Sequence, residues 1–328
     1  MAKVLITGIN GMVGSHLAEY LLNLNHDVHG TIRWRSNLEN ILEMKDRLNL
    51  HYCDLKDRQN IDTVLKDDGY NFIFHLAAQS IVWASFQAPA DTLENNVIGT
   101  LNLLESAKRF CPKAIIHFSG SSEEFGLVKE NECPVNESNP LRPLSPYGVS
   151  KVTAELLCIQ YFKSYGLKTV VTRAFNHSGF GRPEHFAESS FAKQIMERKL
   201  GMTIVPIEVG NLEARRDYTH VNDMVEAYWL AANMCAYGEP YVIASSEAYS
   251  MRQILEMLSE EADIVCDVVQ DPKRIRPSDV PLLIGDASKF RNRTGWTQTH
   301  GGIRQICRDL LEYWKVKLER QKIEEVAV

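Results

Sequence analysis

The feature that most restricts the fold is a glycine-spaced turn directly after the first apolar run. Residues 4–7 read Val-Leu-Ile-Thr, and a turn with glycine at every third position leads into an amphipathic stretch. In such a turn one glycine permits the tight bend, one lets the backbone approach a pyrophosphate, and one allows close helix–strand packing. A turn without a ligand is the alternative, but the strand–helix context favours a nucleotide. The residues expected to hold it are Gly8, Gly11, Met12, Val13 and Gly14.

Short apolar runs alternate with helical patterns through the first half of the chain. This alternation predicts an α/β fold, a doubly wound parallel sheet of the Rossmann type. We expect it to occupy residues 1–175, with a smaller mixed substrate lobe over 176–328 that interleaves with late strands of the main sheet. The expected strands are Val4–Thr7, Asp27–Thr31, Leu48–Cys53, Phe72–Leu76, Ala114–Ser119 and Thr169–Arg173. The expected helices include Val13–Leu24, Thr92–Phe110, Ser189–Gly201, Val221–Met234, Met251–Ala262 and Ile303–Gln321.

Composition excludes several classes of protein. The formal net charge is -6, which argues against nucleic-acid binding through bulk charge. The seven cysteines form no CxxC pair and no zinc-ligand spacing, so we expect reduced thiols and no metal site. No run approaches the roughly 18 apolar residues of a membrane helix. We therefore expect a soluble, cytoplasmic protein.

The end of the second strand indicates the cofactor. An acidic residue there would hold the ribose hydroxyls of NAD. Residues 29–36 contain no carboxylate, but they contain Arg33, Arg35 and Ser36, which suit the 2′-phosphate of NADP. The residues favour NADP, with NAD the less favoured alternative. Asp54 follows the third strand. Its position suits a contact with the adenine and an exposed acidic residue of a loop equally well.

A Tyr-x-x-x-Lys pair supplies the expected chemistry. Tyr147 and Lys151 lie one helical turn apart, so the ammonium should lower the phenol pKa from about 10 towards neutrality. Proton exchange by such a phenol is what hydride transfer at an alcohol carbon needs. Ser121 and Glu123 follow the fifth strand, at the sheet edge where ligands bind in such folds. Ser121 can hydrogen-bond the reacting hydroxyl, and Glu123 offers a second acid–base group.

These strings resemble the extended short-chain dehydrogenase/reductase family. Within it, the chain is similar to enzymes acting on GDP-linked hexoses, the GDP-mannose 4,6-dehydratases and the GDP-4-keto-6-deoxy-mannose reductases. The strings that carry the resemblance are residues 75–80, 121–126, 145–151, 175–177, 209–212, 216–218 and 276–278.

The resemblance implies a role for each matching residue. Catalysis falls to Ser121, Glu123, Tyr147 and Lys151. The cofactor would contact the glycine turn, Arg33, Arg35, Asp54, Leu55, Ala77, Ala78, Tyr147 and Lys151. The nucleotide sugar would contact Gln79, Ser80, Ser122, Asn176, Lys193, Arg216 and Arg276.

Two reactions remain open at this stage. Glu123 and the arginine-rich loop favour a GDP-sugar 4,6-dehydratase that holds NADP tightly, and we adopt that expectation. The segment 176–183 and the residues before Tyr147 resemble the NADPH-dependent reductases, which are the alternative. A non-catalytic NADP-binding sensor is the weaker alternative. The sugar, hexose or heptose, stays open. The resemblance also implies a homodimer or homotetramer, in which the apolar helices Thr92–Phe110 and Pro146–Ser164 pair across a two-fold axis.

Overall fold

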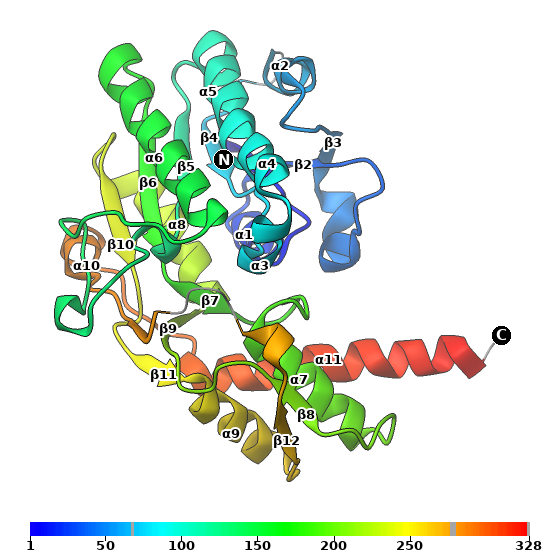
Figure 1. Cartoon of the computed structure of the whole chain (residues 1–328). Coiled ribbons are helices and arrows are strands. Elements are labelled where there is room, and N and C mark those ends of the chain that lie inside the picture. Colours follow the sequence, from blue (N-terminus) through cyan, green and yellow to red (C-terminus); the bar gives the residue numbers. More distant parts are fainter. Residues whose placement is uncertain (67–68, 276–279, 327–328) are drawn as a thin grey trace.

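The computed structural model describes residues 1–66, 69–275 and 280–326. Its main sheet has seven parallel strands in the order β10-β6-β5-β4-β1-β2-β3 (Figure 1). The strands are β1 (Lys3–Thr7), β2 (Asp27–Ile32), β3 (Asn49–Tyr52), β4 (Phe72–His75), β5 (Ile115–Ser119), β6 (Thr169–Ala174) and β10 (Pro240–Ile243). The six strands expected from the sequence are all present, within one or two residues of their expected ends. β10 comes after residue 176 and completes one edge of the sheet.

Helices cover both faces of this sheet, which makes it doubly wound as expected. Side chains alternate between the faces, so that Val4 and Ile6 of β1 enter one core while Leu5 enters the other. The first core is covered by α1 (Met12–Asn23) and α8 (Val221–Met234). The second is covered by α2 (Arg58–Lys66), α5 (Gly99–Phe110) and α6 (Pro146–Tyr165).

The expected helix Thr92–Phe110 is interrupted. It consists of α4 (Pro89–Leu93), a π-helical turn (Glu94–Ile98) and α5. π turns are rare and occur mostly inside α-helices near functional sites. The other short elements are α3 (Val82–Gln87), α10 (Ser288–Thr294) and the 3-10 segments Glu39–Arg47, Ser122–Glu124, Glu130–Glu132 and Pro272–Arg274.

A smaller lobe of mixed structure lies beyond the carboxyl edge of the sheet (Figure 1). Its larger sheet has the order β11-β9-β13, with β7 also paired to β9, and β8 pairs with β12. These strands are β7 (Asn176–Ser178), β8 (Ile207–Val209), β9 (Arg215–His220), β11 (Ala248–Ser250), β12 (Val268–Gln270) and β13 (Leu282–Leu283). The helices α7 (Ala187–Lys199), α9 (Met251–Ala262) and α11 (Gly302–Val326) enclose a third core.

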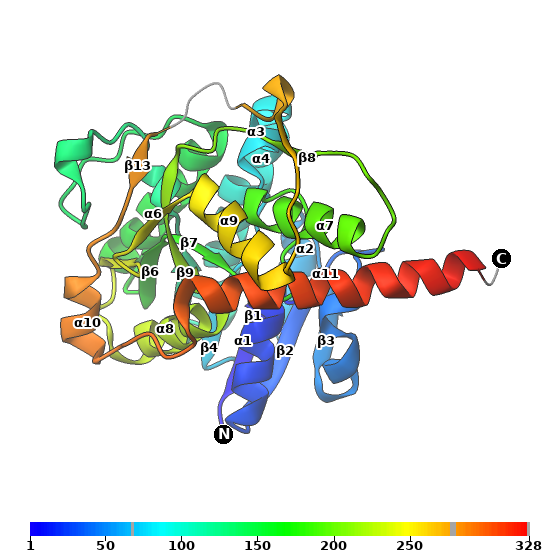
Figure 2. The same cartoon turned by 90° about the horizontal axis from the view of Figure 1, so that it is seen from below.

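The terminal helix α11 runs across the molecule and projects beyond it (Figure 2). It is five residues longer at its end than the expected helix Ile303–Gln321. Leu310, Trp314 and Leu318 anchor it in the third core. Within the described residues, no helix combines the length and the apolar character that a membrane crossing requires.

Candidate active site

The glycine turn between β1 and α1 has the geometry of a nucleotide cradle. Gly8 has φ +71°, and a Cβ there would lie 2.9 Å from the Cα of Ala77. A Cβ on Gly14 would lie 2.4 Å from the Gly8 carbonyl oxygen, so the turn closes only around glycine. At Gly11 a Cβ would meet only that carbonyl, at 3.4 Å, and would otherwise fill open space above the turn. The first-turn amides of α1, which begins at Met12, receive no side-chain cap. Open space beside uncapped amides fits a pyrophosphate.

The loop after β4 closes the cradle. The Ala77 amide donates to the Thr7 hydroxyl at 3.1 Å. Gln79 is expected to face the sugar. Its carboxamide is hydrogen-bonded to neighbouring residues of the protein. Its Nε2 donates to Thr92 at 3.1 Å, and its Oε1 accepts from the Ile81 amide at 2.5 Å. Its substrate role, like those of the half-buried Ala78 and the exposed Ser80, stays a prediction.

A buried chain of hydrogen bonds connects this loop to α6, and no local sequence pattern predicts it. Thr7 Oγ1 lies 2.8 Å from His75 Nδ1, and His75 Nε2 lies 2.8 Å from Thr100 Oγ1. Thr100 donates to the Asn96 carbonyl in the π turn at 2.6 Å, and Asn96 Nδ2 donates to Ser150 at 2.9 Å. Burial, helped by the charge of the nearby catalytic lysine, lowers the pKa of His75 to about 3, so the ring is a neutral connector.

The turn after β2 presents two exposed arginines, Arg33 and Arg35. Two hydrogen bonds of 3.1 Å between Arg33 and Ser36 close this turn. In the described part of the chain, neither guanidinium is engaged in an ion pair or a side-chain hydrogen bond. Both are therefore available to a phosphate. Across the same edge, Asp54 accepts a backbone hydrogen bond within its own turn at 2.9 Å, and Leu55 is buried.

Tyr147 and Lys151 come from the first turns of α6, which Ser145 caps by accepting a hydrogen bond from the Gly148 amide at 3.0 Å. Lys151 Nζ donates to the Ser119 carbonyl at the end of β5 at 2.7 Å. It lies 5.8 Å from the centre of the Tyr147 ring. Burial disfavours its charged form and lowers the pKa of Lys151 to about 8.

The expectation that Lys151 lowers the pKa of Tyr147 is wrong for the protein alone. Burial raises the pKa of the phenol well above 10, and the nearby carboxylate of Glu123 adds to the rise, while a hydrogen bond with Ser121 opposes it. The physical reason is that desolvation of a buried phenolate outweighs the favourable contacts. The ammonium of Lys151 is turned towards a carbonyl of β5 rather than the phenol oxygen.

Ser121 and Glu123 share one tight turn against α6. Ser121 caps the 3-10 segment Ser122–Glu124, and its hydroxyl accepts from the Glu123 amide at 3.2 Å. A Cβ on Gly148 would lie 2.6 Å from the Glu123 carbonyl, so the catalytic helix packs directly on this turn. Ser122, expected to contact the substrate, is buried. The structure therefore brings Ser121, Glu123, Tyr147 and Lys151 together.

Behind this turn lies a buried charged group that sequence reasoning missed. Glu124 accepts from the Ser121 amide at 2.6 Å. Arg173 of β6 binds Glu155 of α6 through two hydrogen bonds, at 3.0 and 2.6 Å. Burial and the neighbouring Glu155 raise the pKa of Glu124 well above its usual value. The turn that carries Ser121 thus rests on a buried polar group, in which Glu124 Oε2 has no hydrogen bond among the described residues and lies 3.9 Å from Arg173 Nε.

The short strand β7 connects the catalytic centre to the smaller lobe. It begins at Asn176, which pairs in register with Tyr218 of β9. Its neighbour His177 was not predicted to have a role. Burial first, and then the charges of Arg182 and Lys151, lower the pKa of His177 to about 4, which puts a neutral imidazole close to the catalytic lysine.

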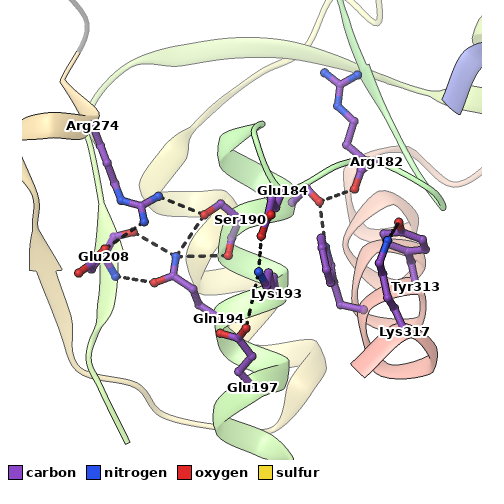
Figure 3. A network of polar contacts seen from close by, with 12 residues as sticks. Arg182, Glu184, Ser190, Lys193, Gln194, Glu197, Glu208, Arg274, Tyr313 and Lys317 are labelled. Carbon is purple, nitrogen blue, oxygen red and sulfur yellow. Dashed lines mark hydrogen bonds and ion pairs between the residues drawn. The ribbon is translucent and has the colours of Figure 1, made fainter. Parts of the chain in front are cut away.

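The cations expected around the diphosphate have different surroundings. Figure 3 shows Lys193 of α7 between Glu184 and Glu197, and it lies 3.8 Å from the second of these. Arg216 of β9 donates to the carbonyl of Val280 at 2.6 Å. Arg276 lies outside the described residues. Arg274, next to it in this region, binds Glu208 and Ser190 at 3.0 and 3.2 Å (Figure 3).

Comparison with known proteins agrees with this geometry. Residues 5–310 match the family model described as GDP-mannose 4,6 dehydratase. GDP-6-deoxy-D-mannose reductase from Pseudomonas aeruginosa is 30% identical over 319 residues, covering 97% of this chain and 99% of the relative. GDP-mannose 4,6-dehydratase from Yersinia enterocolitica is 32% identical over 351 residues, covering 95% and 93%.

One solved structure extends the likeness to the fold. The structure of RMD from Pseudomonas aeruginosa, complexed with NADPH, has a TM-score of 0.84 and 29% identity, and the match covers 97% of this chain and 100% of that one. The sequence similarity spans both lobes. The chain therefore belongs to the GDP-mannose 4,6-dehydratase family of extended short-chain dehydrogenases/reductases.

Proposed function

We propose that this enzyme is a GDP-sugar 4,6-dehydratase of the GDP-mannose type. It would convert a GDP-hexose to its 4-keto-6-deoxy form through transient oxidation at C4. The observation that carries the proposal is the turn that holds Ser121 and Glu123 against the first turn of α6. The carboxylate of Glu123 lies close enough to Tyr147 to raise the pKa of its phenol. A second acid–base group beside the phenol is what elimination requires beyond simple oxidation.

Each catalytic side chain then has a separate task. Tyr147, hydrogen-bonded to Ser121, takes the proton of the C4 hydroxyl as a phenolate, and the ammonium of Lys151 stabilises that phenolate against the desolvation that raises its pKa. Bound NADP would supply the hydride chemistry between C4 and C6. The C4 ketone acidifies the C5 proton, which Glu123 removes. Glu123 then protonates the departing C6 hydroxyl, which leaves as water. Return of the hydride to C6, and of the proton held by Tyr147 to C5, completes a redox-neutral sequence.

NADP is the cofactor that these residues suit best, and we propose that it is tightly held because it is regenerated in every turnover. Arg33 and Arg35 are available for the 2′-phosphate, and no carboxylate ends β2. Residues 1–175 would hold this cofactor, and residues 176–328 would hold the GDP-sugar.

A second function is favoured by a specific observation. The relative from Pseudomonas aeruginosa that matches 97% of this chain is a reductase. Reduction of a GDP-4-keto-6-deoxy sugar needs only Ser121, Tyr147 and Lys151, all of which are present. A non-catalytic NADP sensor is the weaker alternative, since this catalytic set is complete.

One assay separates the three functions. The purified enzyme is incubated with GDP-mannose and a panel of other GDP-hexoses and GDP-heptoses, without added reductant, and the products are identified by mass spectrometry. Loss of one water to give a 4-keto product supports the dehydratase. No conversion, together with NADPH consumption on the 4-keto sugar, would establish the reductase. Cofactor binding without turnover of any sugar would indicate the sensor. Tyr147→Phe is the inactive control.

We also propose that two copies associate through α4, α5 and α6. Leu93 of α4, Ile98 of the π-helical turn, and Val149 and Leu156 of α6 are between 39% and 56% exposed. Apolar side chains gathered on neighbouring helices favour a self-complementary two-fold contact. Leu156→Glu, at the most exposed of the four, should give a monomer in sedimentation analysis while the wild type sediments as a dimer or tetramer. A monomeric wild type at micromolar concentration would exclude this assembly.

A further inference from the structure

The terminal helix of the smaller lobe makes an ion pair with the cofactor half. Lys317 of α11 donates to Glu39 Oε2 at 2.8 Å and to the Tyr313 hydroxyl at 3.0 Å. The side chains of Lys317 and Glu39 are only 25% and 33% exposed. Partial burial opposes the charge of Lys317, but these two hydrogen bonds outweigh it and raise the pKa of the ammonium. The pair joins residues 278 positions apart in the sequence.

Glu39 belongs to a segment that is hydrogen-bonded to the glycine turn. Its amide donates to Asn37 Oδ1 at 2.8 Å. Asn10, in the glycine turn, donates its Nδ2 to the Asn37 carbonyl at 2.9 Å. Asn40 donates back to the Asn10 carbonyl at 3.1 Å. The segment 37–40 and the pyrophosphate turn are therefore held as one unit, and Glu39 is the point at which α11 contacts it.

The same segment continues directly from the turn that carries the two exposed arginines. Only Asn37 and Leu38 separate Ser36, which closes the turn with Arg33, from Glu39. Arg35 within the turn has a positive φ of 62°, a conformation that non-glycine residues adopt only when their surroundings hold them. Apart from the contact of the Trp34 ring with Tyr52, at 5.5 Å between ring centres, this exposed turn is held by the anchoring of its ends.

We propose that Lys317 and Glu39 set cofactor specificity by positioning the turn from Arg33 to Ser36 for the 2′-phosphate. The inference rests on the proposed preference for NADP. Lys317 fixes the far end of the turn and also neutralises a carboxylate on the segment that would receive the phosphate. Without Lys317, Glu39 is an uncompensated negative charge close to a dianionic group. NAD lacks that phosphate, so its binding depends much less on the pair.

Calorimetry of NADP and NAD binding to the wild type and to Lys317→Met tests this. We expect the variant to bind NADP about three- to fivefold more weakly, which corresponds to a partly exposed ion pair, and NAD within about twofold of the wild type. Lys317→Arg keeps the charge and should restore NADP binding. Lys315→Met is the matched control, because Lys315 lies on the same helix and, among the described residues, forms an ion pair only with Glu312 of that helix.

Three results would overturn the inference. They are equal loss of both cofactors, no change in either, and failure of the arginine variant to restore binding. Lys317→Gln, which still can donate a hydrogen bond to Glu39, replaces the methionine variant if thermal melting shows that the latter does not fold, and an intermediate selective loss is then expected. A wild type that binds NAD as tightly as NADP would refute the cofactor proposal and this inference together, whereas an NADP preference that is undiminished in Lys317→Met refutes only the inference.

Discussion

Two lysines expected to serve the same reaction are held in opposite ways. Lys151 is 6% exposed, donates to a backbone carbonyl, and has its pKa lowered by burial to about 8. The side chain of Lys193 is 28% exposed, lies between Glu184 and Glu197, and packs over the Trp314 ring at 5.4 Å. Burial thus fixes the charge of Lys151, and partly exposed ion pairs hold that of Lys193.

The difference corresponds to what each half has to do. Proton transfer requires groups fixed within a few tenths of an ångström, and burial with full hydrogen bonding provides this. A diphosphate-binding cation has to exchange its resting partners for the ligand. Partly exposed ion pairs contribute only about 0–1 kcal/mol, so this exchange costs little. Substitutions should therefore have large and specific effects in the first region and small effects on stability in the second.

The largest effect is expected at Glu123. If the enzyme is a dehydratase, Glu123→Gln should reduce formation of the 4-keto-6-deoxy product by about 10²–10⁴-fold, because a positioned general base is lost. NADP affinity, measured by calorimetry, should not change. The charge-matched control is Glu130→Gln, at an exposed position after the same strand. A modest effect, with reduction of a 4-keto sugar retained, would instead identify the reductase.

The second expected effect is a pH dependence that Lys151 imposes on stability. The folded chain releases the Lys151 proton near pH 8, whereas the unfolded chain holds it to its ordinary pKa of 10.5. Between these values the unfolded state binds more protons, so the free energy of unfolding rises with pH. The wild type should gain about 3 kcal/mol relative to Lys151→Met from neutral pH to above 10.

Denaturant unfolding of the cofactor-free protein at a series of pH values measures this gain. Lys163→Met, which removes a charge from the exposed side of the same helix, is the control. Parallel stability curves for the wild type and Lys151→Met would mean that burial does not perturb Lys151 in solution.

A smaller effect is expected from Arg33, which lies in the catalytic half but is exposed. Arg33→Asp should weaken NADP binding by about 1.5–3 kcal/mol, because a charged phosphate contact is replaced by repulsion. NAD binding should change much less. Lys45→Asp, on the 3-10 segment that follows, makes the same charge change as a control. Equal losses of affinity for NADP and NAD would show that this turn does not bind the 2′-phosphate.

The sequence predicted those parts of the fold and site that depend on local pattern. The glycine turn, the strands of the main sheet and the helices Val221–Met234 and Met251–Ala262 follow from residue type and periodicity. Tyr147 and Lys151 follow from their spacing on one helix. In each case the residues that determine the feature are close together in the chain, which is why a single sequence is sufficient.

The remainder depends on contacts between distant segments. The bonds of His75 to Thr7 and Thr100, and of Arg173 to Glu155, join separate elements, and no local pattern specifies them. The sign of the Tyr147 pKa shift was wrong for the same reason, since burial depends on the whole fold. The ion pair between Lys317 and Glu39 spans almost the entire chain.

The smallest effect on stability, and the sharpest test of the contrast between the two lysines, is expected at Lys193. Lys193→Ala should lower the free energy of unfolding by only about 0–1 kcal/mol, because its ion pairs are partly exposed. The hydrogen bond that Lys193 donates to Glu184 lowers the pKa of that carboxyl, and this lowering should disappear in the variant.

If Lys193 exchanges Glu184 for the diphosphate, the affinity of Lys193→Ala for GDP-mannose should nevertheless fall by about 1.5–3 kcal/mol. Glu184→Gln should do the reverse and tighten GDP-mannose binding slightly, because it removes the competitor. Weakening by both variants would show that the pair is structural, and that the smaller lobe binds the diphosphate with other cations.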